Sequence, residues 1–209
     1  MRLSWYDQEQ TIKHITYPLI PDRSPAGKVF TIKNLSDVEA TLLEPASCAA
    51  HGLDKISPKM GSSVLMFGAG PTGLVLAQLL RQNGGCHVVI AAPEGLKIDL
   101  AKSLDAADVY VPLSRSDPSP MYEKIKKENP YGFDIVVEAT GSVKILQDSM
   151  DYCRRGGKLV VYGVYANDAR VSWSPSKICT FATFPPLFPF FSVSVSLSVS
   201  LCLSLSLVP

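Results

Sequence analysis

Three glycines, at residues 68, 70 and 73, have the spacing of a phosphate-binding turn. The stretch SSVLMFGAGPTGLVLAQLL, residues 62 to 80, passes from an apolar strand pattern through G-x-G-x-x-G into an apolar helix pattern. The first glycine permits a tight turn, the second lets the backbone approach a pyrophosphate, and the third allows close packing of helix on strand. The helix N-terminus adds N–H groups and a positive dipole end. The spacing therefore predicts dinucleotide binding, with a purely structural turn as the alternative.

The end of the next expected strand bears on which dinucleotide is bound. An NAD site usually places an acidic residue there to accept the ribose hydroxyls. In VVIAAPEGLK the place is held by Ala91 and Ala92, while Glu94 comes two residues late and Lys97 follows within one turn. Without a carboxylate to repel a 2′-phosphate, and with a lysine to meet it, the stretch favours NADP over NAD. The alternative for Lys97 is an ordinary solvated helix lysine.

Alternating elements position these residues between Gly61 and Val164. Strands that are apolar on both faces alternate with amphipathic helices, which predicts an α/β fold with a doubly wound parallel sheet of the Rossmann type. Gly84–Gly85 and Gly156–Gly157 lie at the ends of two expected helices, where a residue in the left-handed conformation commonly caps the helix. The expected strands are 62–69, 86–92, 108–113, 133–141 and 158–164, and the expected helices are 71–84, 94–105, 121–129 and 142–157. A sixth strand should follow residue 178, where a low-complexity tail begins instead.

The segment before the sheet carries a helix-start signal. Ser36 followed by Glu39 has the spacing of a capping box. A helix from about Asp37 to Leu53 is expected, with Ala40, Leu43, Ala46 and Ala50 on one side.

Composition excludes several classes of protein. The 209 residues carry a net charge of +1 without a basic block, which argues against a nucleic-acid partner. The five cysteines are odd in number and never form a CxxC pair, which argues against a disulfide scaffold or a zinc knuckle and favours a reducing, cytoplasmic compartment. The N-terminus is too polar for a signal peptide.

The C-terminal tail has no charged residue after Lys177 and reads FPPLFPFFSVSVSLSVSLCLSLSLVP towards its end. A membrane anchor through residues 184–209 is one interpretation, but serine at nearly every second position weakens insertion and gives the period of a strand. We favour another interpretation, in which the Ser-Leu repeat is translated non-coding sequence and the chain is truncated. Membrane attachment is therefore not expected.

Four quoted stretches resemble a known family. LSDVEATLLEPASCAAHGL, VLMFGAGPTG, DIVVEATGS and GGKLVVYG are similar to the zinc-dependent medium-chain alcohol dehydrogenases, in particular to the polyol branch with the sorbitol and arabinitol dehydrogenases. The resemblance covers about residues 25 to 178. It implies an unassigned segment at 1–24, a remnant of the GroES-like catalytic lobe with a connecting helix at 25–57, a dinucleotide-binding domain at 58–178 and the tail at 179–209.

The resemblance also implies an activity and a site. The family transfers hydride between a secondary alcohol, here of a polyol or sugar, and the nicotinamide of NAD or NADP, with a catalytic zinc that polarises the alcohol oxygen. Glu44 matches a glutamate that approaches the metal or its water. The residues implied to bind the cofactor are Gly68, Gly70, Pro71, Thr72 and Gly73 at the phosphates, Ala92 and Lys97 at the adenine ribose, and Thr140, Gly141, Gly163 and Val164 at the nicotinamide half.

The sequence departs from the family at the metal. The family's main zinc ligands, a Cys and a His-Glu pair, have no counterpart in residues 1–43, where His14 is the only histidine and is read as solvated. The intact family member would hold zinc and could form homo-oligomers, whereas this chain is not expected to hold zinc. A catalytically inactive NAD(P)-binding module is therefore the alternative function.

Four further residues have a functional and a structural interpretation. Cys48 and His51 lie three apart on the expected helix and could ligate a metal, although third and fourth ligands are missing and packing is favoured. Cys153 precedes two arginines that could lower the pKa of its thiol, but it is expected to pack in the core. Glu138 is either a site residue or a cap of the next turn, and both interpretations stay open.

Overall fold

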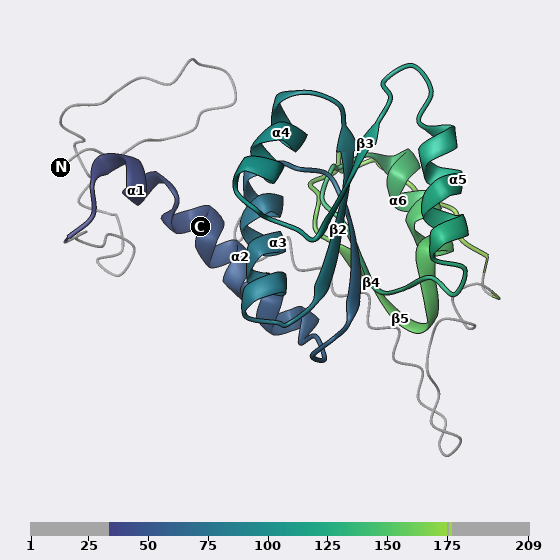
Figure 1. Ribbon diagram of the computed structural model, residues 1–209, viewed down its shortest axis with the longest axis horizontal. Coiled ribbons are helices and arrows are strands. Elements are labelled where there is room, and N and C mark those ends of the chain that lie inside the picture. Colours follow the sequence, from purple (N-terminus) through teal and green to yellow (C-terminus); the bar gives the residue numbers. More distant parts are fainter. Residues whose placement is uncertain (1–33, 175, 177–209) are drawn as a thin grey trace. The chain divides into compact units, whose positions relative to one another are not determined.

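The computed structural model describes residues 34–174 and 176 (Figure 1). The predicted N-terminal segment 1–24 with His14, and the predicted tail 179–209, lie outside the described residues. The chain forms two compact units that divide between Glu44 and Pro45, and each is described by itself.

In the first unit, the predicted capping box is confirmed but the predicted continuous helix is wrong. Ser36 Oγ accepts from the N–H of Glu39 at 3.3 Å, and the Glu39 carboxylate accepts from the N–H of Ser36 at 2.8 Å. Helix α1, Asp37–Thr41, then ends, and α2, Leu43–Ile56, begins. Pro45 accounts for the break, because a proline has no N–H and its ring clashes with the carbonyl four residues earlier, here that of Thr41.

The second unit contains a five-stranded parallel sheet with the order β3-β2-β1-β4-β5. The strand order reverses between β1 and β4, as in the doubly wound sheet that the sequence predicts. The strands are β1 Ser63–Phe67, β2 His87–Pro93, β3 Val109–Leu113, β4 Phe133–Glu138 and β5 Cys153–Val161. The predicted position of a sixth strand, after residue 178, lies outside the described residues.

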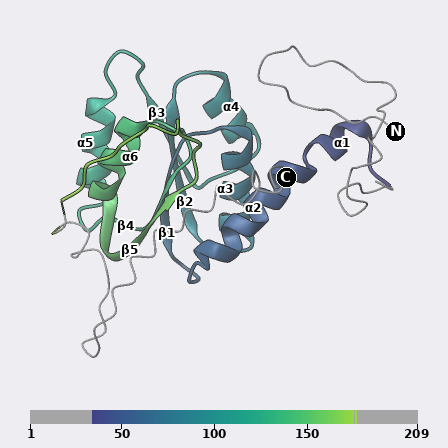
Figure 2. The ribbon, with the colours of Figure 1, turned by 180° about the vertical axis from the view of Figure 1, so that it is seen from behind.

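Helices cover both faces of the sheet (Figures 1 and 2). Helices α3 and α4 lie on one face, and α5 and α6 lie on the other. The helices are α3 Pro71–Gln82, α4 Leu96–Ser103, α5 Ser119–Glu128 and α6 Val143–Ser149, followed by a 3-10 turn at Met150–Tyr152. Because all the strands are parallel, their carboxyl ends lie at the same edge of the sheet.

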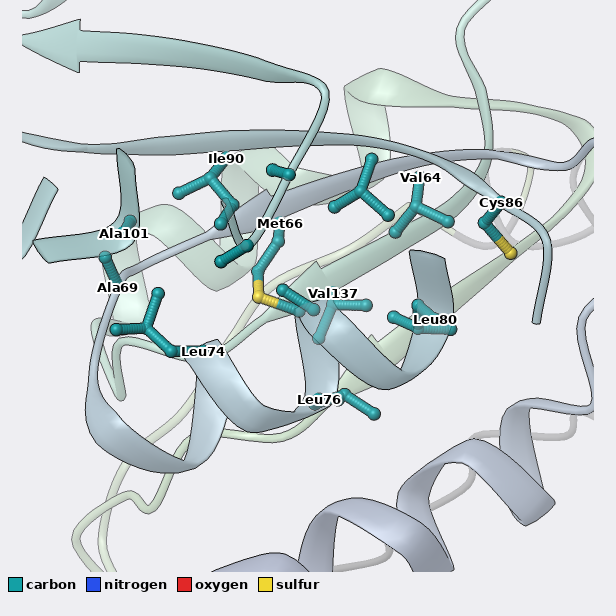
Figure 3. Close-up of a cluster of buried hydrophobic side chains, with 14 of the residues drawn as sticks. Val64, Met66, Ala69, Leu74, Leu76, Leu80, Cys86, Ile90, Ala101 and Val137 are labelled. Carbon is teal, nitrogen blue, oxygen red and sulfur yellow. The ribbon is translucent and has the colours of Figure 1, made fainter. Parts of the chain in front are cut away.

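Alternate side chains of each strand form two separate cores. Val64 and Met66 of β1 pack under α3 with its Leu76 and Leu80, as Figure 3 shows. Leu65 and Phe67, one position along, pack in the cluster that contains Ile125 of α5 and Tyr152. Both faces of β1 are therefore buried, which explains why its sequence is continuously apolar.

The buried side of α2 is not the side that carries Leu43, Ala46 and Ala50. Ala49, Gly52 and Ile56 are its buried residues, whereas Ala46 is only half-buried and Ala50 is exposed. A Cβ on Gly52 would lie 3.2 Å from the Tyr162 ring, so this glycine allows the close approach of the helix.

The helix predicted at 142–157 is present but shorter than predicted. Helix α6 ends at Ser149, and β5 already begins at Cys153. Gly156 has a φ of +72°, and the register between β4 and β5 shifts between Phe133 and Ile135. Gly156–Gly157 thus belongs to an irregular stretch of β5 and not to a helix cap, whereas Gly85, with a φ of +60°, does adopt the left-handed conformation after α3.

The outer strand β3 contains Pro112, which pairs in register with Ala92 of β2. A proline inside a sheet is confined to edge strands, because it has no N–H to donate to a further neighbour. In the part of the chain that the structure describes, no helix is both long and apolar enough to cross a membrane.

We expect Leu80→Ala to lower the free energy of unfolding by about 2–5 kcal/mol, because Leu80 of α3 is fully buried in the core between this helix and the sheet, and truncation leaves a cavity. Urea denaturation followed by circular dichroism measures the loss. Leu96→Ala removes the same atoms from a side chain that is 89% exposed, so it should change the stability by less than about 0.5 kcal/mol. Equal losses for the two variants would contradict the described packing.

Candidate functional site

The glycine-rich turn lies at the carboxyl ends of β1 and β4, where the strand order reverses. Gly68 N–H donates to the carbonyl of Ala91 at 2.9 Å, and Ala139 N–H donates to the carbonyl of Phe67 at 2.9 Å. The ends of β1, β2 and β4 are thereby held together. Ligands of open α/β sheets bind in the crevice at such a reversal point.

The three glycines of the turn have different physical reasons to be glycine. Gly68 has a φ of +105°, and a Cβ there would lie 2.9 Å from Thr140 Cγ2. A Cβ on Gly73 would lie 3.5 Å from that of Ala139, which is close helix–strand packing. Gly70 has an extended backbone, φ −76° and ψ 166°, and a Cβ there would have no atom of the described residues within 4 Å. Neither the backbone conformation nor the packing of the described residues requires glycine at position 70.

The N-terminus of α3 offers N–H groups next to Gly70. Gly70 is the N-cap, Pro71 follows as the first helical residue, and no side chain of the described residues caps the helix. The first intrahelical bond runs from Leu74 N–H to the carbonyl of Gly70 at 2.8 Å. The N–H groups of Thr72 and Gly73 precede this bond, so they are available to an anion. The arrangement fits a pyrophosphate.

The predicted ribose residues lie at the end of β2. Ala92 is buried, and Glu94 and Lys97 are exposed in the following loop and in the first turn of α4. Glu94 N–H donates to the carbonyl of Leu113 at 3.0 Å, which fixes the loop to the end of β3. The structure thus keeps Ala92 and Lys97 at the sheet edge that carries the glycine turn.

The predicted nicotinamide residues lie close together, in the turn after β4 and the segment after β5. Gly141 has a φ of +75°, and a Cβ on it would overlap the carbonyl of Val164. Gly163 is buried and its N–H donates to the carbonyl of Glu138 at 2.8 Å. Thr140 and Val164 are exposed. The structure brings these positions together, and their role in cofactor binding remains a prediction.

The carboxylate of Glu138 ties these two segments together. Glu138 is fully buried, and its Oε1 accepts from Thr140 N–H at 2.7 Å and from the Thr140 hydroxyl. Its Oε2 accepts from Gly141 N–H at 3.3 Å and from the Tyr165 hydroxyl. Glu138 is therefore a cap of the turn after β4 that also holds the segment after β5. Sequence reasoning missed Tyr165, because a residue 27 positions away gives no local signal.

Tyr165 is held in its protonated form at this junction. Partial burial, followed by its hydrogen bond to Glu138 and the charge of that carboxylate, raises the pKa of Tyr165 well above its ordinary value. The hydroxyl is therefore a permanent donor at neutral pH.

The candidate metal residues do not converge. Among residues 34–174 and 176, no three His, Cys, Asp or Glu side chains are grouped so that they could hold a metal ion. Cys48 is half-buried and His51 is exposed on α2. Glu44 is exposed in the first turn of α2 and belongs to the first unit, so its role beside a metal remains a prediction.

The functional interpretation of Cys153, with a lowered pKa, is wrong. Burial, followed by the charge of Asp151, raises the pKa of the Cys153 thiol to about 12. The side chain is buried at the start of β5, in the core cluster on the α5 side of the sheet. Cys153 is a core residue, as the structural interpretation predicts.

A family model described as Zinc-binding dehydrogenase matches residues 71–188. D-arabinitol dehydrogenase 1 of Uromyces fabae is 61% identical over 153 residues, which are 73% of this chain and 44% of that protein. L-threonine 3-dehydrogenase of Pseudoalteromonas atlantica is 30% identical over 151 residues, 72% of this chain and 43% of that protein. The chain thus spans less than half the length of these curated relatives.

Among solved structures, a putative zinc-binding dehydrogenase from Sinorhizobium meliloti bound to NADP is 29% identical, with a TM-score of 0.56. The match covers 65% of this chain and 39% of that one.

We expect Gly68→Ala and Gly70→Ala to differ sharply in stability. Gly68→Ala should lower the free energy of unfolding by about 1–3 kcal/mol, since alanine is strained at this φ and its Cβ meets Thr140. Gly70→Ala should change it by less than about 0.5 kcal/mol, because backbone and space both accept a methyl group. Urea unfolding of both variants measures the two changes in the free energy of unfolding. A strongly destabilised Gly70→Ala would mean that the fold itself demands this glycine.

We expect Tyr165→Phe to destabilise the protein by about 2 kcal/mol at neutral pH, since a donor to a buried carboxylate is lost. The pKa of Tyr165 is raised on folding, so its contribution is complete below the unfolded value of about 10 and is lost as the pH rises through the higher folded pKa. The stability difference from the wild type should be flat near neutral pH and should narrow above about pH 10. Urea titrations across this range test it, with Tyr131→Phe, at an 89% exposed site, as the control. A gap that widens at high pH would refute the described role of Tyr165.

Proposed function

Because the chain belongs to the zinc-binding dehydrogenase family, we propose that it binds a nicotinamide dinucleotide in the crevice at the ends of β1 and β4. We further propose that the activity of the whole protein is hydride transfer between a secondary alcohol of a polyol and that dinucleotide. The bound dinucleotide would supply the hydride acceptor.

Gly70 is the observation that carries the proposal. Neither the backbone conformation of Gly70 nor its neighbours among the described residues require a glycine, so a ligand that comes close to the backbone would account for it. A pyrophosphate that approaches the backbone at this point gives that explanation, since a side chain would occupy its place. The N–H groups of Thr72 and Gly73 and the N-terminal end of α3 would then bind the phosphate oxygens.

The other predicted residues would orient the dinucleotide. Thr140, Gly141, Gly163 and Val164 would border its nicotinamide half. The bonds of Glu138 to Thr140, Gly141 and Tyr165 fix that border before a ligand arrives, so less ordering is needed on binding.

We propose NADP as the preferred form. The end of β2 carries Ala92, where an acidic residue would repel a 2′-phosphate, and Lys97 follows in the first turn of α4. The NADP-bound state of the Sinorhizobium meliloti structure supports this choice.

A polyol is the proposed substrate class. The support is the 61% identity to a protein named D-arabinitol dehydrogenase 1, against 30% to an L-threonine 3-dehydrogenase. We also propose that the intact enzyme acts in the cytoplasm and assembles from identical subunits.

Zinc does not fit the described residues. No three potential ligands come together within residues 34–174 and 176. This observation favours a second candidate function for the chain, a dinucleotide-binding module without turnover.

We expect the full chain to bind NADPH saturably, and Gly70→Ala to weaken binding at least about tenfold because its methyl group occupies the pyrophosphate's place. Titration of NADPH fluorescence measures both affinities, and unchanged circular dichroism shows that the variant is folded. A wild-type chain that binds neither NADPH nor NADH would overturn the proposal.

Turnover separates the two candidate functions. The chain is mixed with NADP⁺ and D-arabinitol, with and without added Zn²⁺, and the NADPH absorbance is followed. Formation of NADPH supports the dehydrogenase. Binding without NADPH formation supports the inactive module.

A further inference from the structure

Arg115 lies against Glu94 in the loop that follows β2, although it comes 21 residues later in the chain. Strands β2 and β3 pair in parallel, with Pro93 opposite Leu113, so the segments after both strands leave the same edge. The backbone bond from Glu94 N–H to the carbonyl of Leu113, at 3.0 Å, closes these two segments together. Arg115, two residues beyond Leu113, is thereby brought to the position where the dinucleotide's adenosine end is proposed to bind.

The guanidinium of Arg115 faces the turn at Glu94 and Gly95, which we call the corner; Gly95 has no side chain to fill it. Arg115 Nη2 donates to the carbonyl of Glu94 at 3.4 Å. It also lies 3.6 Å from the position that a Cβ on Gly95 would take. Gly95 has a φ of +122°, which favours glycine, so the chain keeps this corner open.

Among the described residues, no carboxylate pairs with the positive charges of Arg115 and Lys97. By contrast, Arg81 pairs with Asp105 and Asp108. The only acidic side chain of the loop is that of Glu94, and Arg115 bonds its backbone carbonyl and not its carboxylate. The corner therefore presents two cations to solvent.

We propose that Arg115 determines the specificity for NADP by binding the 2′-phosphate, together with Lys97 from the other side of the loop. This inference rests on the proposed dinucleotide function and assigns a residue to its selectivity. Arginine suits the task, because its planar fork gives paired, charge-assisted hydrogen bonds to phosphate oxygens. The long bond to a neutral carbonyl is one that the guanidinium can exchange for stronger bonds to the phosphate.

The test compares two dinucleotides that differ only in the 2′-phosphate. NADPH and NADH are titrated against the full wild-type chain, Arg115→Ala and Arg115→Lys. Arg115→Ala should weaken NADPH binding at least about tenfold and change NADH binding less than about twofold. Arg115→Lys should recover part of the loss. The wild-type preference for NADPH should also fall with added salt, and this dependence should be reduced in Arg115→Ala.

Arg155→Ala is the matched control, because it removes the same charge from an exposed arginine of β5. It should leave both affinities unchanged. Equal weakening of NADPH and NADH by Arg115→Ala would overturn the proposal, as would unchanged NADPH binding. A selective loss of NADH binding in Glu94→Gln would also overturn it, since the loop would then read the ribose hydroxyls. Absence of all binding in the wild type would instead overturn the proposed function itself.

Discussion

The parallel pairing of β1 with β4 is the contact on which the candidate site depends. Val64 to Phe67 pair in register with Ile135 to Glu138, and the chain leaves these two strands towards opposite faces of the sheet. In open α/β sheets, such a divergence is the place where ligands bind, at the carboxyl ends of the two strands. A slip of one residue in this register would turn every buried side chain of one strand to the other face and would move Glu138 away from Tyr165.

The sequence predicts the sheet well because the signal there is local. Apolar runs such as VLMF and VVIAA report burial on both faces, and the glycine spacing reports a turn between strand and helix. The continuity of the helix predicted at 37–53 and the end of the helix predicted at 142–157 were wrong, for reasons that are also local. Pro45 interrupts the first, and the second ends at Ser149, before the irregular strand that contains Gly156. In both cases the prediction extended a helix along the apolar periodicity, across residues whose backbone does not continue a helix.

The candidate site could be predicted only where one segment forms it. Gly68, Gly70 and Gly73 were found from their spacing, but the spacing does not distinguish their reasons. Gly68 needs its positive φ, Gly73 allows close packing of helix on strand, and Gly70 has no described neighbour in front of it. Arg115 and Tyr165 escaped prediction because their partners, at Glu94 and Glu138, lie on other elements. Such partners follow from the order of the strands, which no short stretch of sequence contains.

Pro112 has a consequence for how sheets of this kind could be joined. It lies in the outer strand β3, where it withholds the N–H that an added strand would need, so extension on that side is blocked. In the described part of the chain, β5 pairs only with β4 and contains no proline. Within the described residues, edge-to-edge joining of two sheets is therefore disfavoured at β3 and not at β5. Two copies joined through β5 would present β3 at both ends, which gives a closed pair and not a growing fibre.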